Sequence, residues 1–566
     1  MLKHCLLFFC FIFIGFIIYQ NGLYSSYIFE DDTLDITQSE PFFRQGLIPT
    51  LIHFFNTPTL SDSERPITAL SFWVNYKIFG PDPLGFRLVS LFIHALVCFS
   101  IFFLCKNWPG VNPSSLAAAA AALLFLVHPL HVSAVQLFVV ERAVLLAGLF
   151  GICSLIFFLK YIRSPKRIFL GLSLTCLVLS VLSKPDGVAF LLILLGFITF
   201  FRIRLPLWAY PTFFLIPSIL LVFFVLNLHP INPLMAWYKY LSVQTRVTAA
   251  YLWLFFWPFD LNSLYSIKPD PNIFHNGSWA FILGHLSVLT IIFGYLRKYN
   301  VPFFLAGISI YLAFIPESSF FPLQTYLYEY RAYLPYIFLS VLIYLFILKM
   351  PQPKIGVAIL LCICVIFSFT TYSRSVKRSL KLNYDIAFIK DPRSMDQVNY
   401  RIIYSLIIQG EKDKMREALR CLISQNRPSQ DIYKAIYIMF NQVDKPLNTE
   451  QEKLVKTYLE QCKTAVELSC LLRIIEALTI SPIILDRDSF KHDILFNKYD
   501  LFLNSSAPSL KGLRSELHDI DKRLINRYLT QKTLKNEEEI RLNQAQAVLR
   551  LLSMSSHMSI KNKFNE

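Results

Sequence analysis

Long apolar segments follow one another through the first two thirds of this chain, and they limit its possible folds. A helix needs about 20 apolar residues to cross a membrane, or about 17 at the short end. Eight segments reach or approach this length, and three are shorter or weaker: 5–20, 84–104, 142–160, 186–201, 207–227, 279–295, 333–349 and 355–372, then 115–128, 168–183 and 301–315. The sequence therefore predicts an all-α, polytopic membrane protein with about 11 transmembrane helices.

The charge content excludes a soluble globule. Only 16% of the 566 residues are charged, whereas about 25% is usual in soluble proteins. The net charge of +16 is typical of some nucleic-acid-binding proteins, but in a membrane protein charge is interpreted by side before it is summed. We therefore predict membrane lipids, and no nucleic acid, among the partners.

Basic residues are confined to alternate loops of the predicted topology. With Lys3 inside, the cytoplasmic loops and their flanks contain twelve bases and no Asp or Glu. All 14 acids of residues 1–373 fall on the opposite side. Because Lys and Arg resist translocation, this pattern indicates the orientation of the spans. The segment 234–257 is also apolar, but a crossing there would reverse the favoured sides, so we predict an interfacial or re-entrant helix.

Composition changes near residue 373 and divides the chain into two predicted domains. Residues 1–373 form the membrane domain, and 374–566 form a polar helical domain outside the cytoplasm, of ordinary domain size. Within the second, 396–409 and 412–424 flank Gly410 with helical apolar spacing. This helix–turn–helix suits a degenerate tetratricopeptide-like repeat, and a plain helical bundle is the alternative. We predict a bacterial inner-membrane protein with a periplasmic C-terminal domain.

The predicted outer face holds the residues suited to chemistry. Asp31 and Asp32 follow the first span, where adjacent carboxylates act as a general base or bind a divalent metal; the alternative is a solvated turn. Arg142, Lys184 and Arg331 lie at the outer ends of spans. Each alone suits an interfacial anchor, but together these cations suit a clamp for a phosphate group.

Seven motifs follow one another along the chain: Asp31-Asp32, Arg65-Pro66-x-Thr68-x-Leu70-Ser71-Phe72, His128-Pro129-x-His131, Glu141-Arg142, Ser183-Lys184, Ile315-Pro316-Glu317-Ser318 and Glu329-x-Arg331-x-Tyr333-Leu334-Pro335. In this order they resemble the multi-span protein O-mannosyltransferases, closest to those with a tetratricopeptide-repeat tail and their bacterial relatives. These belong to the polyprenyl-phosphate-sugar-dependent glycosyltransferases of the GT-C fold. The resemblance covers about residues 20–375 and, more weakly, the tail to about 425.

The resemblance implies roles for particular residues. Asp31 or Asp32 is the catalytic base that activates an acceptor hydroxyl, with Asp31 preferred. The donor phosphate is held by four side chains, and four more support the site: Arg331, Lys184, Arg142 and His128, then Arg65, His131, Glu329 and Tyr333. Two positions depart from the family's pattern, because Ser133 and Pro185 stand where the family usually has acids.

The implied reaction is an inverting transfer of a sugar from a polyprenyl-phosphate donor to a hydroxyl acceptor on the outer face, with protein Ser or Thr favoured over a glycan or lipid. We predict no cofactor and no metal, since the basic residues replace Mg²⁺ or Mn²⁺ at the phosphate. One alternative is a transporter or flippase for a lipid-linked sugar, which should carry polar residues at mid-membrane. Another is a non-catalytic assembly protein that binds partners through its helical tail.

The orientation leads to a first prediction. A reporter that is active only outside the cytoplasm, fused after Glu566, is expected to be active, because an odd number of spans exports the tail. The measurement is the reporter signal in intact cells. A matched fusion in the basic loop 160–167 is expected to be silent. Activity of a cytoplasmic reporter after Glu566 would contradict the proposed count of spans.

Overall fold

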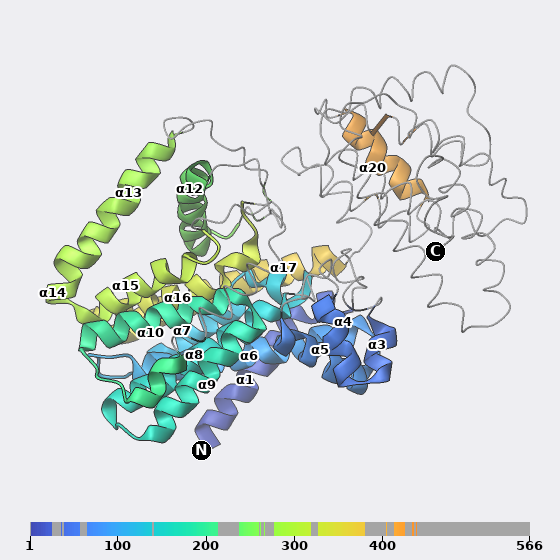
Figure 1. The fold of residues 1–566 in the computed structure, drawn as a ribbon. Coiled ribbons are helices and arrows are strands. Elements are labelled where there is room, and N and C mark those ends of the chain that lie inside the picture. Colours follow the sequence, from blue (N-terminus) through green and yellow to red (C-terminus); the bar gives the residue numbers. More distant parts are fainter. Residues whose placement is uncertain are drawn as a thin grey trace, which may run out of the picture. The chain divides into compact units, whose positions relative to one another are not determined.

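A computed structural model describes most of the first 379 residues and short parts of the remainder. The described residues are 2–24, 36, 39–56, 65–137, 141–212, 215, 237–259, 261, 265, 277–318, 326–379, 403, 412–424, 433–434 and 437. Every regular element among them is helical (Figure 1). Six described helices are long and apolar enough to cross a membrane, and four more are shorter but apolar. The prediction of a polytopic helical membrane protein is confirmed.

Ten of the eleven predicted spans coincide with described helices. They are α1 (Leu2–Leu23), α6 (Pro83–Asn107), α7 (Ser115–Val127), α8 (Arg142–Arg163), α9 (Arg167–Ser183), α10 (Val188–Phe201), α13 (Ser278–Thr290) continued by η6 (Ile291–Leu296) and α14 (Arg297–Tyr299), α15 (Val301–Phe314), α16 (Tyr333–Lys349) and α17 (Pro353–Ser379). The eleventh, 207–227, lies largely outside the described residues.

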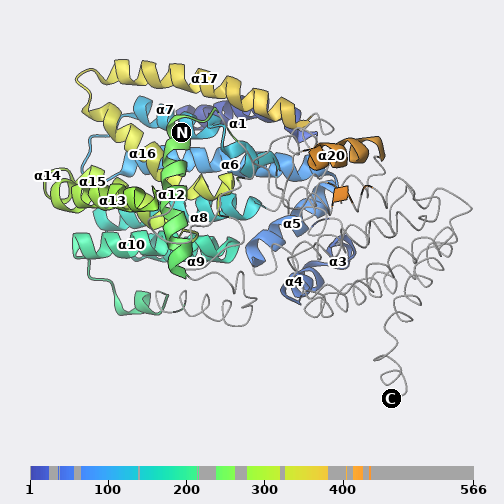
Figure 2. The ribbon, with the colours of Figure 1, turned by 90° about the horizontal axis from the view of Figure 1, so that it is seen from above.

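The central helices of the bundle are α6, α7, α8 and α16. Helices α1 and α17 pack together on one side of them, and α9, α10 and α15 complete the other side (Figures 1 and 2). About 72% of the α8 and α16 spans is buried, against 6% of the span formed by α13 to α14. The span formed by α13 to α14 therefore presents its apolar side chains outward, as lipid-facing helices do.

Small residues allow α8 to approach its neighbours closely. Ser173 of α9 donates to the carbonyl of Ser154 at 2.9 Å, and Ser180 donates to the carbonyl of Ala147 at 2.7 Å. Also on α8, a Cβ on Gly151 would overlap the ring of Phe190 in α10. Small residues of this kind let helix backbones meet within a membrane.

The loops that charge assigns to opposite sides gather at opposite ends of the bundle. At the predicted cytoplasmic end, Arg163 donates to the side-chain and main-chain oxygens of Asn107, both at 2.9 Å, and Trp108 donates to the carbonyl of Pro302 at 3.1 Å. At the other end, Thr68 donates to the carbonyl of Ser183 at 2.9 Å. The structure thus separates the two sets of loops, while the side that each faces stays a prediction.

Two helical additions lie beside the bundle. Helices α3 (Glu40–Gln45), α4 (Leu47–Asn56) and α5 (Pro66–Phe79) belong to the predicted first outer loop and share a small apolar core. Helix α12 (Trp237–Phe256) lies across the direction of the bundle helices in both views (Figures 1 and 2). This orientation fits the expectation that 234–257 does not span.

The chain divides into two compact units, Met1–Lys381 and Leu382–Glu566. In the second unit the structure describes α20 (Lys412–Ser424), which confirms a helix predicted at that position. The predicted helix 396–409 and residues 438–566 lie outside the described residues. The repeat-like character of this unit therefore stays a prediction.

Two glycine-to-alanine substitutions, one in α8 and one in α9, test the packing of α8. Gly151→Ala is expected to lower the free energy of unfolding by about 1–3 kcal/mol, because the added methyl overlaps the Phe190 ring and the core must shift. The matched control is Gly171→Ala in α9, where the Cβ meets open space; there better helix propensity gives a gain of at most about 1 kcal/mol. The measurement is thermal unfolding in detergent, and equal behaviour of both variants would contradict the packing.

Candidate functional site

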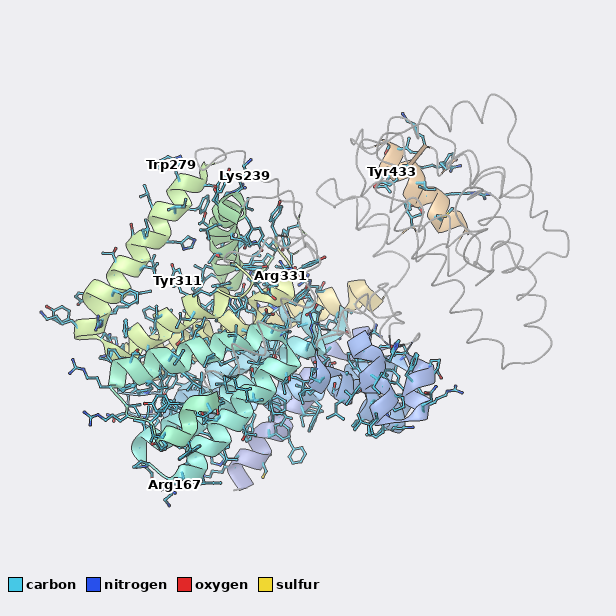
Figure 3. The ribbon with its side chains drawn as sticks, in the orientation of Figure 1. Arg167, Lys239, Trp279, Tyr311, Arg331 and Tyr433 are labelled. Carbon is cyan, nitrogen blue, oxygen red and sulfur yellow. The ribbon has the colours of Figure 1, made fainter. Side chains whose placement is uncertain are left out.

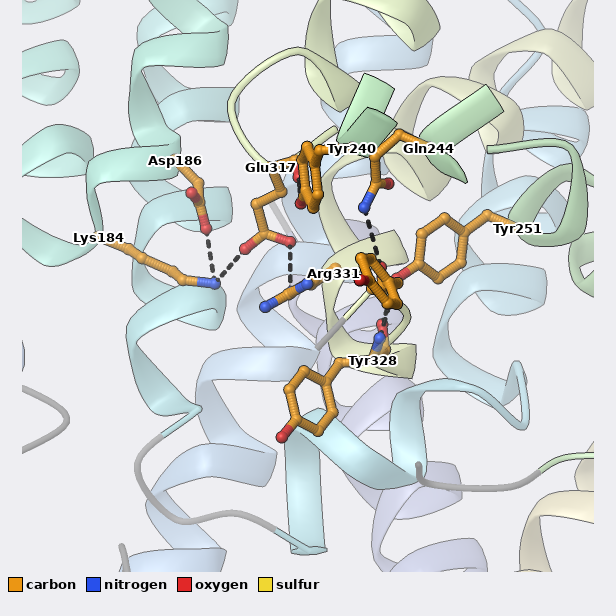
Figure 4. A network of polar contacts seen from close by, with 9 residues as sticks. Lys184, Asp186, Tyr240, Gln244, Tyr251, Glu317, Tyr328 and Arg331 are labelled. Atoms are coloured by element: carbon orange, nitrogen blue, oxygen red, sulfur yellow. Dashed lines mark hydrogen bonds and ion pairs between the residues drawn. The ribbon is translucent and has the colours of Figure 1, made fainter. Parts of the chain in front are cut away.

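Four charged side chains converge at the predicted outer end of the bundle. Lys184 follows α9, Asp186 lies in η3 (Pro185–Gly187), Glu317 follows α15, and Arg331 lies in η7 (Glu329–Ala332) (Figure 4). Pro185 disfavours helical conformation in the residue before it. Accordingly α9 ends at Ser183, and Lys184 adopts extended backbone with φ −154° and ψ 136°.

Glu317 bridges the two cations with its two carboxylate oxygens. Lys184 Nζ lies 2.8 Å from Glu317 Oε1, and Arg331 Nε lies 3.2 Å from Glu317 Oε2. Lys184 Nζ also lies 2.6 Å from Asp186 Oδ2. The four side chains are 6–17% exposed, so the ion pairs lie in surroundings of low dielectric, where they are stronger than at a surface.

Tyrosines from α12 and from the residue before η7 lie beside this cluster (Figure 4). The ring of Tyr330 lies 5.1 Å from Lys184 Nζ, and the ring of Tyr328 lies 5.0 Å from Arg331 Cζ. Tyr240 of α12 donates to the main-chain carbonyl of Glu317 at 2.9 Å. Ring faces attract cations within about 6 Å, so aromatic and acidic groups together hold both cations in place.

Burial and neighbouring charges change the acid–base behaviour of the cluster. Burial raises the pKa of Glu317, and the adjacent carboxylate of Asp186 raises it further, to about 8, although Lys184 and Arg331 act in the opposite direction. Burial by itself lowers the pKa of Lys184, but the carboxylates of Asp186, Glu317 and Glu141 outweigh it and hold that pKa above its usual value. Lys184 therefore stays charged while Glu317 is able to take up a proton.

A second buried ion pair lies beside the cluster. Arg374 Nη2 donates to Glu329 Oε1 at 2.7 Å and to Oε2 at 2.5 Å. Arg374 Nη1 also donates to the carbonyl of Pro129 at 2.8 Å. Arg374 near the end of α17 thus connects η7 to the turn after α7, so Glu329 supports the loop that presents Arg331.

The histidines predicted at the site belong to an aromatic cluster instead. The Leu130 N–H lies 3.3 Å from His128 Nδ1, so His128 Nε2 is the donor to the Phe255 carbonyl at 3.1 Å. With both ring nitrogens occupied, His128 has no atom left for a phosphate, which differs from its predicted role. His131 packs against Tyr333, and the Tyr333 hydroxyl lies 2.8 Å from His94 Nδ1. These supporting residues shape the interior rather than the charged cluster.

Arg142 also differs from its predicted role. Its guanidinium donates to Asn75 Oδ1 at 2.9 Å and to the Phe86 carbonyl at 2.7 Å, and it lies 5.0 Å from the Phe72 ring centroid. Arg142 is fully buried. These contacts connect α8 to α5 and α6, so the residue is a structural connector.

The structure describes only some of the remaining predicted site residues. Arg65 precedes α5 and acts electrostatically on Lys184 and Asp186. Asp31 and Asp32 lie outside the described residues. Among described residues no group of three or more His, Cys, Asp or Glu side chains is arranged to hold a metal ion. Independence from metal stays a prediction.

The sequence did not single out three residues on which this site depends. Pro185, the neighbour of Asp186, is a departure from the family pattern, and Glu317 is part of one motif. Both are acids among spans nearly free of charge, and such residues are functional candidates by default. Arg374 stood at the expected domain boundary, and no local pattern in the sequence pairs it with Glu329.

Comparison with known proteins agrees with the motifs. The chain is 33% identical over 187 residues to human "Protein O-mannosyl-transferase TMTC3", covering 30% of this chain and 19% of the relative. It is 29% identical over 222 residues to the Drosophila melanogaster Tmtc3 protein of the same description, covering 33% and 23%. This chain is similar to protein O-mannosyl-transferases. The resemblance inferred from the motifs is confirmed.

A Caenorhabditis elegans protein O-mannosyl-transferase, F38B6.6, is 32% identical over 125 residues, or 22% of this chain and 17% of the relative. The chain therefore spans about a fifth of the length of the curated relatives that it matches. No family model matches the sequence, and no solved structure matches the fold.

The Glu329–Arg374 pair can be tested by removing one partner. Arg374→Met is expected to lower the free energy of unfolding by about 3–5 kcal/mol, because the buried Glu329 carboxylate loses its counter-ion. The control is Arg44→Met, whose exposed pair with Glu40 is screened by water, so little change is expected. Chemical or thermal unfolding in detergent measures both. A small effect at Arg374 would argue against a supporting role for this pair.

Proposed function

We propose that this chain is an integral-membrane glycosyltransferase that moves a sugar from a polyprenyl-phosphate donor to a hydroxyl group of an acceptor protein. The observation that carries the proposal is the pair Lys184 and Arg331, held side by side through Glu317 at one end of an apolar bundle. Two cations at a membrane surface, enclosed by tyrosines, suit the phosphate of a lipid whose tail stays in the bilayer.

In the proposed reaction the acceptor oxygen attacks the anomeric carbon, and the bond from that carbon to the phosphate oxygen breaks. The phosphate leaves with the electron pair, and Asp31 or Asp32 accepts the hydroxyl proton. The configuration at the anomeric carbon inverts. Lys184 and Arg331 stabilise the charge that develops on the leaving phosphate, which is the largest contribution expected from a preorganised site.

The names of the relatives support the acceptor class, since each is described as acting in protein O-mannosyl transfer. The match covers only a third of this chain or less, so the sugar, the acceptor and the donor lipid are part of the proposal. So are a GT-C fold, a bacterial inner membrane and an outward-facing C-terminal unit. In this scheme that helical unit binds the acceptor protein, as repeat-like helices do with extended partners.

The contacts sharpen the assignment of roles. Lys184 and Arg331 are the proposed phosphate-binding residues, with Arg65 nearby. Arg142 is not among them, because its guanidinium is already bound by carbonyl and amide oxygens.

The central prediction concerns transfer by purified protein. Wild type supplied with polyprenyl-phosphate mannose and an acceptor extract is expected to transfer sugar. Arg331→Ala and Lys184→Ala are expected to lower the rate about 10²–10³-fold, because a charge opposite the leaving phosphate is lost. Asp31→Asn and Asp32→Asn separate the two candidates for the base. Transfer of labelled sugar to protein is the measurement.

The matched control is Arg167→Ala, an exposed arginine far from Arg331 at the other end of the helices (Figure 3). It is expected to leave the rate unchanged. Wild type that moves the donor lipid across vesicles without transferring sugar would support a flippase instead. Wild type that transfers no sugar from any donor would favour an assembly protein, and undiminished transfer by all four variants would refute the assigned residues.

A further inference from the structure

Glu317 occupies the place where a bound phosphate would be expected. Its two oxygens contact one cation each, Lys184 Nζ at 2.8 Å and Arg331 Nε at 3.2 Å. A phosphate group offers a similar arrangement, in which two oxygens on one central atom can each lie against one cation. A donor phosphate and an ionised Glu317 therefore compete for the same two cations.

The charges of the cluster decide which of them can stay. Lys184 and Arg331 are balanced by Asp186 and Glu317 when both acids are ionised. Arg65 and Glu141, which also act electrostatically on Lys184, add one charge of each sign. A phosphodiester carries one further negative charge, which buried surroundings would leave without a partner at a large cost. If Glu317 is neutral, the cluster has one positive charge to spare, which matches a phosphodiester.

The proton has a place in the structure. The carboxyl groups of Glu317 and Asp186 are close enough for a side-chain hydrogen bond to each other. Two buried carboxyl groups in such contact share one proton between them. A neutral Glu317 can therefore donate to Asp186, which keeps its own contact with Lys184 at 2.6 Å.

We propose that an ionised Glu317 is an internal counter-anion of Lys184 and Arg331, and that a polyprenyl phosphodiester binds between these two cations only with Glu317 protonated, so that binding takes up one proton wherever Glu317 is ionised beforehand. The proton comes from solvent and stays on the Glu317 carboxyl, so no covalent bond changes. This proposal rests on the proposed function, because it assumes that the ligand of the two cations is a lipid phosphodiester. It makes Glu317 a positioning residue that sets the charge accepted by the site.

Other groups around Glu317 do not remove the need for this proton. Its titratable and charged neighbours are Lys184 and Asp186 from the turn between α9 and α10, Arg331 and Tyr330 from η7, and Tyr240 and Tyr251 from α12. Burial raises the pKa of Tyr251 and Tyr330 well above its usual value, so both stay neutral in the range used. Lys184 and Arg331 stay charged because neighbouring groups raise their pKa values. Burial raises the pKa of Glu317 to about 8, so it is the group that titrates near neutrality.

The test is binding of a short-chain polyprenyl-phosphate mannose to the full-length protein in lipid nanodiscs. This probe is a phosphodiester and does not titrate in the range used. Between about pH 8 and pH 10, wild-type affinity is expected to fall about tenfold per pH unit, because binding takes up one proton. Below about pH 7 it is expected to level off, since Glu317 is already neutral.

Two variants change the proton requirement in different ways. Glu317→Gln keeps the shape without the charge, so its affinity is expected to hardly change with pH and to exceed wild type above about pH 9. Asp186→Asn removes the carboxylate that raises the Glu317 pKa, so its affinity is expected to start falling at a lower pH than that of wild type. A purely structural Glu317 predicts the opposite, weaker binding by Glu317→Gln at every pH. The matched control Glu40→Gln, in the exposed pair with Arg44, should keep the wild-type slope.

A measurement on wild type alone covers the case in which the variants fail to fold. Calorimetry in two buffers of different ionisation enthalpy should count about one proton taken up above pH 9 and almost none near pH 6. Binding that is tight and independent of pH would overturn this inference and leave the proposed function standing. Failure of wild type to bind the probe at any pH would overturn both.

Discussion

A carboxylate held between two buried cations is the interaction on which the outer end of this protein depends. Charged groups tolerate burial only when each has a partner, and Glu317 partners Lys184 and Arg331 together. The surrounding backbone serves this arrangement. Pro185 ends α9 so that Lys184 faces the cluster, and α12 lies across the bundle, where Tyr240 binds the Glu317 main chain.

The other buried polar groups either connect helices or pack among aromatic rings. Arg374 and Glu329 connect the last described helix of the bundle to the loop of the site, and Arg142 connects α8 to the outer-loop helices. His94, His128 and His131 pack with tyrosine and phenylalanine rings. The histidine rings thus serve in packing, and the guanidinium groups of Arg142 and Arg374 serve as connectors. The adjacent Lys184, Arg331, Glu317 and Asp186 remain for a ligand.

Much of the fold followed from the sequence because its signals are local. Ten of the predicted spans are helices, since a run of apolar residues in a membrane has to satisfy its own backbone. The motifs also led to Lys184 and Arg331, which do lie together. The same motifs led to His128 and Arg142, because a motif records residue types and spacing but not whether a side chain's donors are already bound.

The sequence alone determined that this is a helical membrane protein, which segments form its helices, and which loops share a side, because apolar length and loop charge act on each segment separately. The tertiary structure decided which charges share a counter-ion. Glu317 meets Lys184 across 133 positions of sequence, and no local pattern specifies such a distant pair. Packing of α9, α15 and η7 at one end brings these residues together, and burial there turns an ordinary glutamate into a group that can hold a proton near neutral pH.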